Sequence, residues 1–177
     1  FTATLYLVPF EPIQREILVN APEPHRILLY RRMMLRIAER LALRERARAL
    51  VTGDSRGQVA SQTVPTLAAV GAVARLPLLR PLVGDDKIEI LDLARRIGTY
   101  HISAEPFHDC CPIFMPKSPT LFASAAELDA AESSLDVEAL VRAGVTSALR
   151  ERYELRAGAV ERIASPARQH AAADERR

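Results

Sequence analysis

Short apolar runs alternate with longer amphipathic stretches over the first hundred residues of the chain. The runs lie at residues 4–8, 49–52 and 76–79, and a proline or glycine follows each within two positions, which is typical of strands. Residues 25–46 instead carry apolar side chains three and four positions apart, as a helix with one buried stripe does. The expected stripe consists of Ile27, Tyr30, Met34, Ile37 and Leu41. This alternation favours an α/β fold in which the first strand is buried.

Further helices follow from capping and spacing signals. Asp86 and Glu89 form a capping-box pattern, which predicts a helix over 87–96 that stops at Gly98. Weaker patterns predict helices over 11–19, 60–74, 127–132 and 136–153, with Pro65 at a kink or in a first turn. Residues 99–119 contain four prolines and no sustained period, so we expect a loop there. The chain beyond residue 156 has little to bury, so we predict one domain over 1–156 and a disordered tail over 157–177.

Composition sets broad limits on the protein. It has 177 residues, of which 49% are hydrophobic, and this is enough for one domain with a core. We find no apolar run of membrane-spanning length and no secretory signal pattern, so we expect a cytoplasmic protein without a membrane partner. The formal charge is only +2, yet eight arginines crowd residues 26–48. They form either a solvated helix face or a surface that receives phosphate groups.

The only two cysteines, Cys110 and Cys111, are neighbours that directly follow His108 and Asp109. A disulfide between neighbours closes a small strained ring, so we expect two thiols in a reducing compartment. Three interpretations stay open. The thiols pack in the core, as cysteines commonly do. They bind zinc with His108 and Asp109, although ligands so close in sequence suit a tetrahedral site poorly. Alternatively, one of them is a nucleophile.

Two further positions suggest a bound anion. Residues 53–58 form a glycine-containing turn between a predicted strand and a predicted helix, where free backbone N–H groups and the helix dipole attract anions. By itself this turn is a weak signal. Lys87 begins the capped helix, where a cation opposes the helix dipole by up to about 1 kcal/mol. A bound phosphate would offset that cost, and so would the acidic neighbour Asp85.

Several segments, in this order, resemble the tRNA 4-thiouridine sulfurtransferase family. The most specific is the twelve-residue stretch TGDSRGQVASQT at residues 52–63. The other matching segments are residues 31–34, 80–82, 86–87, 97–99, 109–111 and 116–119. The similarity runs from about residue 5 to residue 120.

This resemblance implies a fold of the adenine nucleotide alpha hydrolase type, a Rossmann-like parallel sheet flanked by helices, here without its first β-α unit. It implies an enzyme that uses ATP, with Mg²⁺, to transfer a persulfide sulfur to the uridine at position 8 of tRNA. The uridine O4 is a poor leaving group, so the family adenylates it and then displaces AMP with a cysteine persulfide. The implied partners are tRNA and a cysteine desulfurase as sulfur donor, and a homodimer is left open.

The resemblance also assigns roles to individual residues. Cys111 matches the sulfur-carrying cysteine, and Cys110 is a candidate to resolve a disulfide after transfer. Lys87 matches a lysine that the family needs for activity. The resemblance assigns nucleotide binding to Gly53, Asp54, Ser55, Gly57, Gln58 and Gln62. It assigns tRNA binding to Arg31, Arg32 and Arg80. No residue is assigned to a metal.

The chain also departs from the family pattern. The phosphate loop Ser-Gly-Gly-x-Asp-Ser does not occur in the sequence, and neither do RNA-docking modules or a rhodanese-type domain. We expect the loop to lie one strand and one helix before Phe1, which makes this chain the C-terminal portion of a catalytic domain. The alternative is an inactive fragment or truncated paralogue that at most binds RNA or protein. In a third interpretation, the two cysteines form a dithiol redox module that needs no ATP.

Overall fold

The computed structural model describes residues 1–56, 62–106, 114–156 and 158–163. They divide into two compact units. One unit comprises Phe1–Pro9 with the described residues from Ser147 onward, and the other is Phe10–Thr146. The single domain that we predicted over 1–156 therefore spans parts of both units. Every predicted site residue that the structure describes lies in the larger one.

The smaller unit is an antiparallel sheet of three strands in the order β1–β4–β5. These strands are β1 (Thr2–Leu7), β4 (Leu149–Arg156) and β5 (Ala159–Ile163). Leu7 lies opposite Leu149, and Leu155 lies opposite Val160. Residues directly opposite one another share a face of the sheet, so one face of this unit is mainly apolar.

The structure differs from three expectations for this unit. The first strand is neither buried nor parallel, because it pairs antiparallel with β4, and Leu5 and Leu7 are 44% and 46% exposed. The helix predicted over 136–153 ends at Ser147, and the chain continues as β4. Residues 159–163 of the predicted disordered tail form β5, while residues 157 and 164–177 lie outside the described part. The sheet pairs opposite ends of the chain, which local patterns do not reveal.

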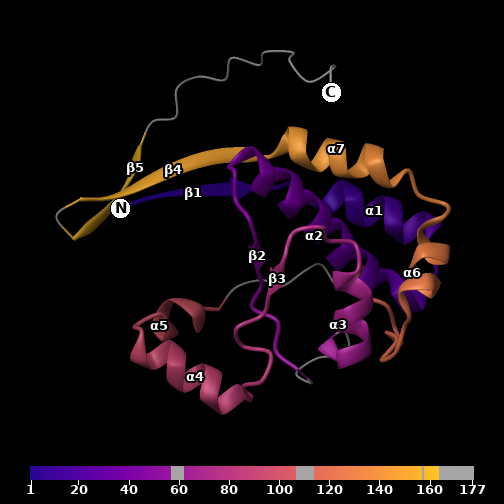
Figure 1. The fold of residues 1–177 in the computed structure, drawn as a ribbon, viewed down its shortest axis with the longest axis horizontal. Helices are drawn as coiled ribbons and strands as arrows, with labels where there is room; N and C mark the ends of the chain where they lie inside the picture. Colours follow the sequence, from indigo (N-terminus) through magenta and orange to yellow (C-terminus); the bar gives the residue numbers. More distant parts are fainter. Residues whose placement is uncertain (57–61, 107–113, 157, 164–177) are drawn as a thin grey trace. The chain divides into compact units, whose positions relative to one another are not determined.

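The larger unit is built around α2 (Arg26–Arg44), which contacts α1, α3, α6 and β2. Its other elements are α1 (Glu11–Asn20), the 3₁₀ turn η1 (Glu23–His25), β2 (Leu50–Val51), α3 (Val64–Gly71), β3 (Leu78–Leu79), α4 (Lys87–Arg96), α5 (Tyr100–Ser103), α6 (Ala125–Glu132) and α7 (Val137–Ser147). Figure 1 shows β2 and β3 side by side, and they pair in parallel. The predicted α/β fold is therefore confirmed, although each parallel strand is short. None of the described helices combines the length and the apolar character that crossing a bilayer requires.

The core lies where α2 meets its neighbours. Ile17, Leu29, Met33 and Leu128 are almost completely buried there. Of the predicted stripe, Tyr30, Ile37 and Leu41 are buried, but Met34 is 46% exposed. Because α2 is covered by helices and by β2, it buries residues on more than one face. The single predicted stripe therefore contains only part of the residues that α2 buries.

The predicted helix caps are confirmed. Asp86 accepts from the backbone N–H groups of Ile88 and Glu89, and the Glu89 carboxylate accepts from the Asp86 N–H. The helix stops at Gly98, whose φ of +79° suits glycine. Pro65 lies in the first turn of α3, so there is no kink, and Thr63 caps that helix.

Gly144 of α7 provides a test of the core packing. A Cβ at this position would lie 2.5 Å from Ile37 Cδ1 and 3.2 Å from Ile13 Cδ1. Overpacking costs about 1–3 kcal/mol, and the better helix propensity of alanine returns about 1 kcal/mol. We therefore expect Gly144→Ala to lower the free energy of unfolding by about 1 kcal/mol. In an Ile37→Val background, which lacks the contacting methyl, the same change should be neutral or stabilising. Urea unfolding of the parent chain, the two single variants and the double variant measures this coupling, and equal effects of Gly144→Ala in both backgrounds would contradict the packing.

Candidate functional site

The predicted nucleotide-binding turn begins at the carboxyl edge of the parallel strands. The N–H of Thr52 donates to Leu79 O at 3.0 Å. The chain therefore leaves β2 at Thr52 and β3 at Arg80 side by side. In open α/β sheets, ligands bind at this edge.

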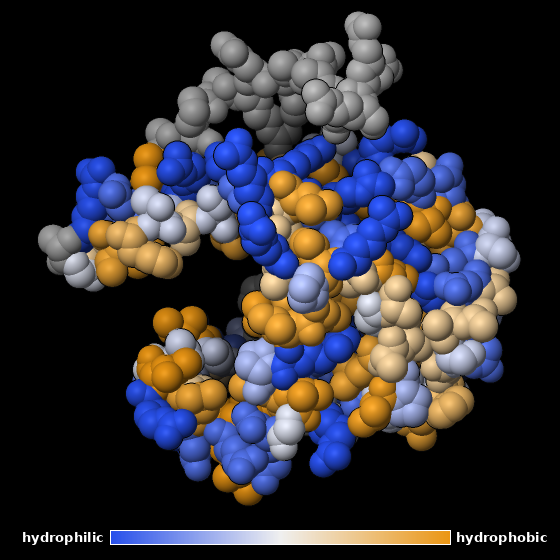
Figure 2. Space-filling view, in the orientation of Figure 1, coloured by the Kyte–Doolittle hydropathy of each residue, from blue (hydrophilic) through white to orange (hydrophobic). Residues whose placement is uncertain are grey.

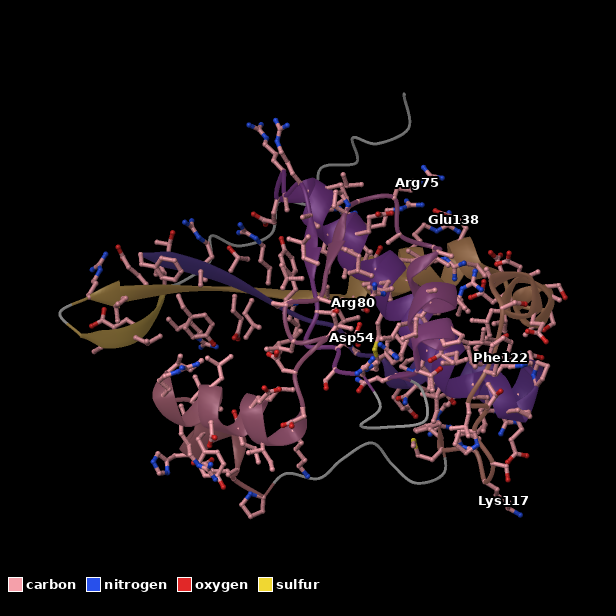
Figure 3. The ribbon with its side chains drawn as sticks, turned by 60° about the horizontal axis from the view of Figure 1, so that its bottom comes forward. Asp54, Arg75, Arg80, Lys117, Phe122 and Glu138 are labelled. Carbon is pink, nitrogen blue, oxygen red and sulfur yellow. The ribbon has the colours of Figure 1, made fainter. Side chains whose placement is uncertain are left out.

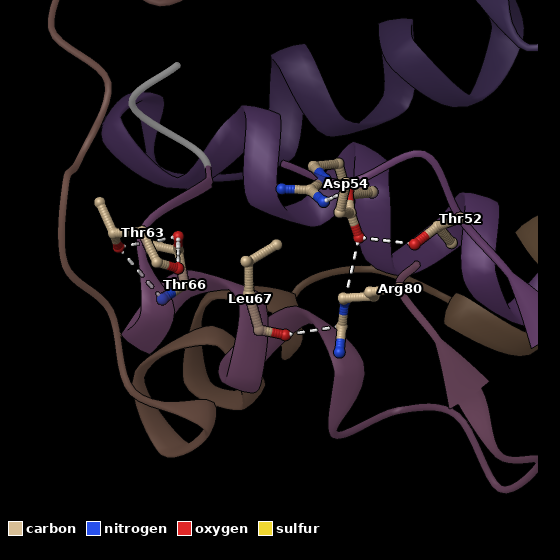
Figure 4. Close-up of polar contacts among 7 residues, drawn as sticks. Thr52, Asp54, Thr63, Thr66, Leu67 and Arg80 are labelled. Carbon is tan, nitrogen blue, oxygen red and sulfur yellow. Dashed lines mark hydrogen bonds and ion pairs between the residues drawn. The ribbon is translucent and has the colours of Figure 1, made fainter. Parts of the chain in front are cut away.

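The carboxylate of Asp54 is the centre of the site (Figures 3 and 4). Its Oδ1 accepts a hydrogen bond from Arg31 Nη2, and the pair is an ion pair. Its Oδ2 accepts from Thr52 Oγ1 at 2.8 Å and from Arg80 Nε at 3.1 Å. Only 12% of the Asp54 side chain is exposed. This one carboxylate therefore joins α2, the turn after β2 and the turn after β3.

Arg80 extends the network to α3. Its Nη2 donates to Leu67 O at 2.9 Å, as Figure 4 shows. A Cβ at Gly71 would lie 2.8 Å from the same Nη2. Glycine at this position therefore leaves room for a guanidinium that is already held at Nε and Nη2.

In this cluster, two guanidinium groups contact one carboxylate among the described residues. These three groups together carry one net positive charge. Burial lowers the pKa of Arg31, Asp54 raises it, and the like charge of Arg80 lowers it again. Arginine nonetheless stays protonated in proteins. A partly buried site with an excess positive charge at the end of parallel strands suits a phosphate or another anion.

Ser55 connects this turn to the start of α4. It is buried, and its Oγ donates to Asp85 O at 3.3 Å. Lys87 follows two residues later, exposed in the first turn of α4. In the part of the chain that the structure describes, Lys87 has no ion pair, and Asp85 does not neutralise it. The structure thus places the turn and the helix start that carries Lys87 next to each other.

A second set of contacts fixes the segment that follows the cysteine pair. Tyr30 Oη donates to the carbonyl oxygen of Phe114 at 3.1 Å, and this contact is buried. Thr63 Oγ1 donates to Leu121 O at 2.9 Å, and the N–H of Thr120 donates to Pro24 O at 3.1 Å. Because Tyr30 is the neighbour of Arg31, consecutive residues of α2 hold the segment that begins at Phe114 and the Asp54 turn.

The structure describes some of the predicted site residues but not all of them. It brings Asp54, Ser55, Arg31 and Arg80 together, whereas Gly57, Gln58, Cys110 and Cys111 lie outside the described residues. Gly53 is exposed, and a Cβ there would meet nothing within 4 Å. Gln62 is half-buried immediately before Thr63. The three interpretations of the cysteine pair therefore stay predictions.

Arg32 is placed differently from the other predicted tRNA contacts. Its side chain is 2% exposed and pairs with Asp129, and its Nε lies 3.3 Å from Glu132 Oε1. Arg36 holds the same glutamate through two hydrogen bonds of 2.7 and 2.8 Å. A buried guanidinium with two carboxylates fastens α2 to α6. It could reach a phosphate only by leaving both carboxylates, so we assign it no further role in binding.

Sequence reasoning did not single out three contributors to the site. These are Tyr30, Thr52 and Gly71. Thr52 is two positions from Asp54 in the sequence. Their proximity in the TGDSRGQVASQT stretch was therefore a sequence signal for the hydrogen bond between them. Tyr30 was assigned to the core, and nothing local showed that its hydroxyl reaches Phe114, which is 84 positions away. Nothing near Gly71 indicated a neighbouring guanidinium.

Among the described residues, no three His, Cys, Asp or Glu side chains converge in a way that could hold a metal ion. Among the described His, Asp and Glu residues, those nearest to the cysteine pair in sequence are Glu105 and His101. Both are exposed. The described residues therefore form no all-protein site for the Mg²⁺ that the family resemblance implies.

Comparison with known families gives one match over most of the chain. Residues 1–137 match the family model described as thiamine biosynthesis protein (ThiI). A probable tRNA sulfurtransferase of Thermus thermophilus is 51% identical over 151 residues, which are 85% of this chain and 36% of that protein. A protein of the same description from Moorella thermoacetica is 49% identical over 137 residues, which are 77% of this chain and 35% of that protein. The chain thus spans about a third of the length of these relatives.

One solved structure is similar over nearly the whole chain. It is a crystal structure of a 4-thiouridine synthetase–RNA complex with bound ATP. The TM-score is 0.83 at 37% sequence identity, and the match covers 87% of this chain and 40% of the other. This agreement confirms the α/β fold that the sequence resemblance implied.

The Asp54 cluster makes a measurable contribution to stability. Asp54→Asn keeps the shape of the side chain but removes the counter-charge that Asp54 supplies to Arg31 and Arg80. We expect the free energy of unfolding to fall by on the order of 3 kcal/mol, as when a buried ion pair loses one partner. Asp92→Asn is the matched control, because Asp92 pairs with Arg95 at the surface, and its loss should stay within about 0.5 kcal/mol. Similar losses in denaturant unfolding of the two variants would contradict the central role of Asp54.

Proposed function

The chain belongs to the ThiI family, and from that premise we propose that it is part of a tRNA sulfurtransferase that transfers sulfur to a tRNA uridine at the expense of ATP. The observation that carries this proposal is the pair of guanidinium groups that converge on Asp54 at the carboxyl edge of β2 and β3. Both the nucleotide and the activated uridine are phosphate esters in this reaction. A partly buried pair of guanidinium groups is suited to hold such an ester.

In the first step, the uridine O4 attacks the α-phosphorus of ATP and pyrophosphate leaves. This turns O4 from a poor leaving group into part of an AMP ester. We propose that Gly53, Asp54, Ser55 and Gln62, with Gly57 and Gln58, line the nucleotide site. Arg31 and Arg80 hold the turn through Asp54 and supply its positive charge. The Lys87 ammonium binds a phosphate oxygen in this proposal, which explains a cation in the first turn of α4.

In the second step, the terminal sulfur of a persulfide on Cys111 attacks C4 of the uridine, and AMP leaves with O4. The uridine is then joined to Cys111 through a sulfur–sulfur bond. A second thiol attacks the Cys111 sulfur and releases 4-thiouridine with its new sulfur, leaving a disulfide that an external reductant opens. Cys110 is the candidate for this thiol because it is the only other cysteine of the chain. Both cysteines lie outside the described residues, so their roles rest on the family resemblance.

The remaining parts of the proposal concern other molecules. tRNA is the substrate, a cysteine desulfurase charges Cys111 with sulfur, and the reaction takes place in the cytoplasm. A homodimer stays open. Mg²⁺ commonly accompanies ATP by neutralising phosphate charge, but the described residues offer no converging ligands for it. We therefore route no step through a metal ion.

A second candidate function is an RNA- or protein-binding piece without catalytic activity. This candidate applies if no Ser-Gly-Gly-x-Asp-Ser loop accompanies these 177 residues, which do not themselves contain that sequence. The two candidates differ in a direct way. Thiolated tRNA should appear in cells that lack their own sulfurtransferase when they express a protein containing this chain with an intact phosphate loop, and it should not appear if the chain is only a binding piece.

Two substitutions in that protein separate the steps. Cys111→Ser should abolish 4-thiouridine, seen as loss of thiolated tRNA on mercury-containing gels, while tRNA-dependent pyrophosphate release from ATP continues. Lys87→Ala should instead slow pyrophosphate release at least tenfold, because it removes a charge from the activation step. Arg96→Ala, at the other end of α4, is the control and should change neither. Thiolation by the Cys111→Ser protein would refute the assignment of the sulfur carrier.

A further inference from the structure

The arginines of the long helix fall into two groups. Arg31, Arg32 and Arg36 turn toward carboxylates on the turn after β2 and on α6. Arg44, Arg46 and Arg48 are exposed, and none of them has an ion pair in the described part of the chain. Glu45 is the one carboxylate among residues 44–48. Ion pairs thus hold the arginines from Arg31 to Arg40, whereas Arg44, Arg46 and Arg48 have none among the described residues.

The backbone at the end of α2 adds an independent observation. The N–H of Arg46 donates to Leu43 O at 3.1 Å, and the N–H of Ala47 donates to Ala42 O at 2.8 Å. These bonds define a helix-ending turn whose central residue adopts the left-handed conformation, usually as glycine. Here that residue is Arg46, with a φ of +59°. A side chain in this conformation costs stability relative to glycine, so an exposed arginine at this position needs another explanation.

Arg75 belongs to the same end of the molecule. Its N–H donates to the buried carboxylate of Glu39 at 2.6 Å, which fixes the loop that leads into β3. Its side chain is exposed, lies near Glu138 in Figure 3, and has no ion pair among the described residues. It lines a cavity of about 390 Å³ together with Arg40, the residue one helical turn before Arg44. The lining of this cavity reaches Leu43 in the last turn of α2 and also includes the carboxylates of Glu39 and Glu138.

These four arginines lie at the amino edge of the parallel strands. Arg48 precedes β2 by two residues, and Arg75 precedes β3 by three. The Asp54 cluster is at the opposite, carboxyl edge. Hydrophilic residues gather over the end of α2 in Figure 2. The dipole of α2 favours a cation at Arg44, but it does not account for the arginines that follow the helix.

We propose that Arg44, Arg46, Arg48 and Arg75, here named the arginine surface, bind the phosphate backbone of RNA. The inference rests on the proposed function and deepens it, because it identifies a second place where the tRNA is held, away from the reacting uridine. Guanidinium groups form paired hydrogen bonds with phosphate oxygens, and a cluster of exposed arginines that outnumbers its neighbouring carboxylates is the electrostatic pattern of a nucleic-acid surface. Such contacts position RNA without reading its sequence.

The first experiment measures binding of the 177-residue chain to an unmodified tRNA transcript by fluorescence anisotropy between 50 and 200 mM salt. The triple variant R44Q/R46Q/R48Q should bind at least tenfold more weakly, and the slope of log affinity against log salt should fall by about 2–3, close to one per lost phosphate contact. The control R15Q/R95Q/R156Q removes the same charge from arginines that are paired with carboxylates. It should change the affinity less than threefold.

The second experiment uses Arg46→Gly, which separates a binding role from a structural one. Glycine relieves the left-handed conformation, so the thermal midpoint should rise by about 2 °C or more. The affinity for the tRNA transcript should fall in the same variant. A residue that matters only for folding would not show opposite effects on stability and binding. Unchanged tRNA affinity in Arg46→Gly would overturn the role of Arg46.

The remaining outcomes are equally decisive. If the chain does not bind the tRNA transcript, if the triple variant and its control lose affinity equally, or if the surface binds only vesicles of anionic phospholipid, the inference is wrong. None of these results bears on the roles of Cys111 and Lys87, which thiolation and pyrophosphate release measure separately. Conversely, an inactive protein that still loses tRNA affinity in the triple variant would refute the proposed function and keep the arginine surface.

Discussion

The ion cluster at Asp54 is the interaction on which the site depends. One mostly buried carboxylate holds Arg31 of the long helix, Thr52 of its own turn and Arg80 from the neighbouring strand. The parallel strands are only two residues long each, so backbone pairing alone offers little to fix their carboxyl edge. Charged hydrogen bonds, which are stronger than neutral ones, take over that task. The same contacts place two guanidinium groups beside one carboxylate at the sheet edge where ligands of α/β folds bind.

The long helix α2 links this cluster to the rest of the larger unit. Its residue Tyr30 holds the carbonyl of Phe114, while the adjacent Arg31 holds Asp54. On another face, Arg32 and Arg36 fasten α6 through Glu132. The arginines of one helix therefore perform three tasks: they support the turn, join two helices and, at the end of the helix, present free charge. The nucleotide site proposed at one strand edge and the RNA contact proposed at the other would let a single enzyme hold both a nucleotide and a tRNA.

Local signals predicted local structure well. The capping box of α4 and the stop at Gly98 are confirmed, because each depends on residues within one helical turn. The α/β fold and the TGDS turn were also recognisable in the sequence. The pairing of Asp54 with Arg31 and Arg80 was not, because the partners lie 23 and 26 positions away and an arginine pattern does not show which charges are neutralised. The pairing of β1 with β4 was missed for the same reason, since it joins opposite ends of the chain.

We propose that the Asp54 cluster forms the phosphate-binding part of a nucleotide site. Titration of AMP into the ¹⁵N-labelled chain, followed by NMR, is the direct test of this proposal. The amide signals of Gly53, Ser55 and Lys87 should shift together with one affinity, and Arg80→Gln should remove this response while the protein stays folded. Shifts that avoid these three amides, or that persist unchanged in Arg80→Gln, would contradict it.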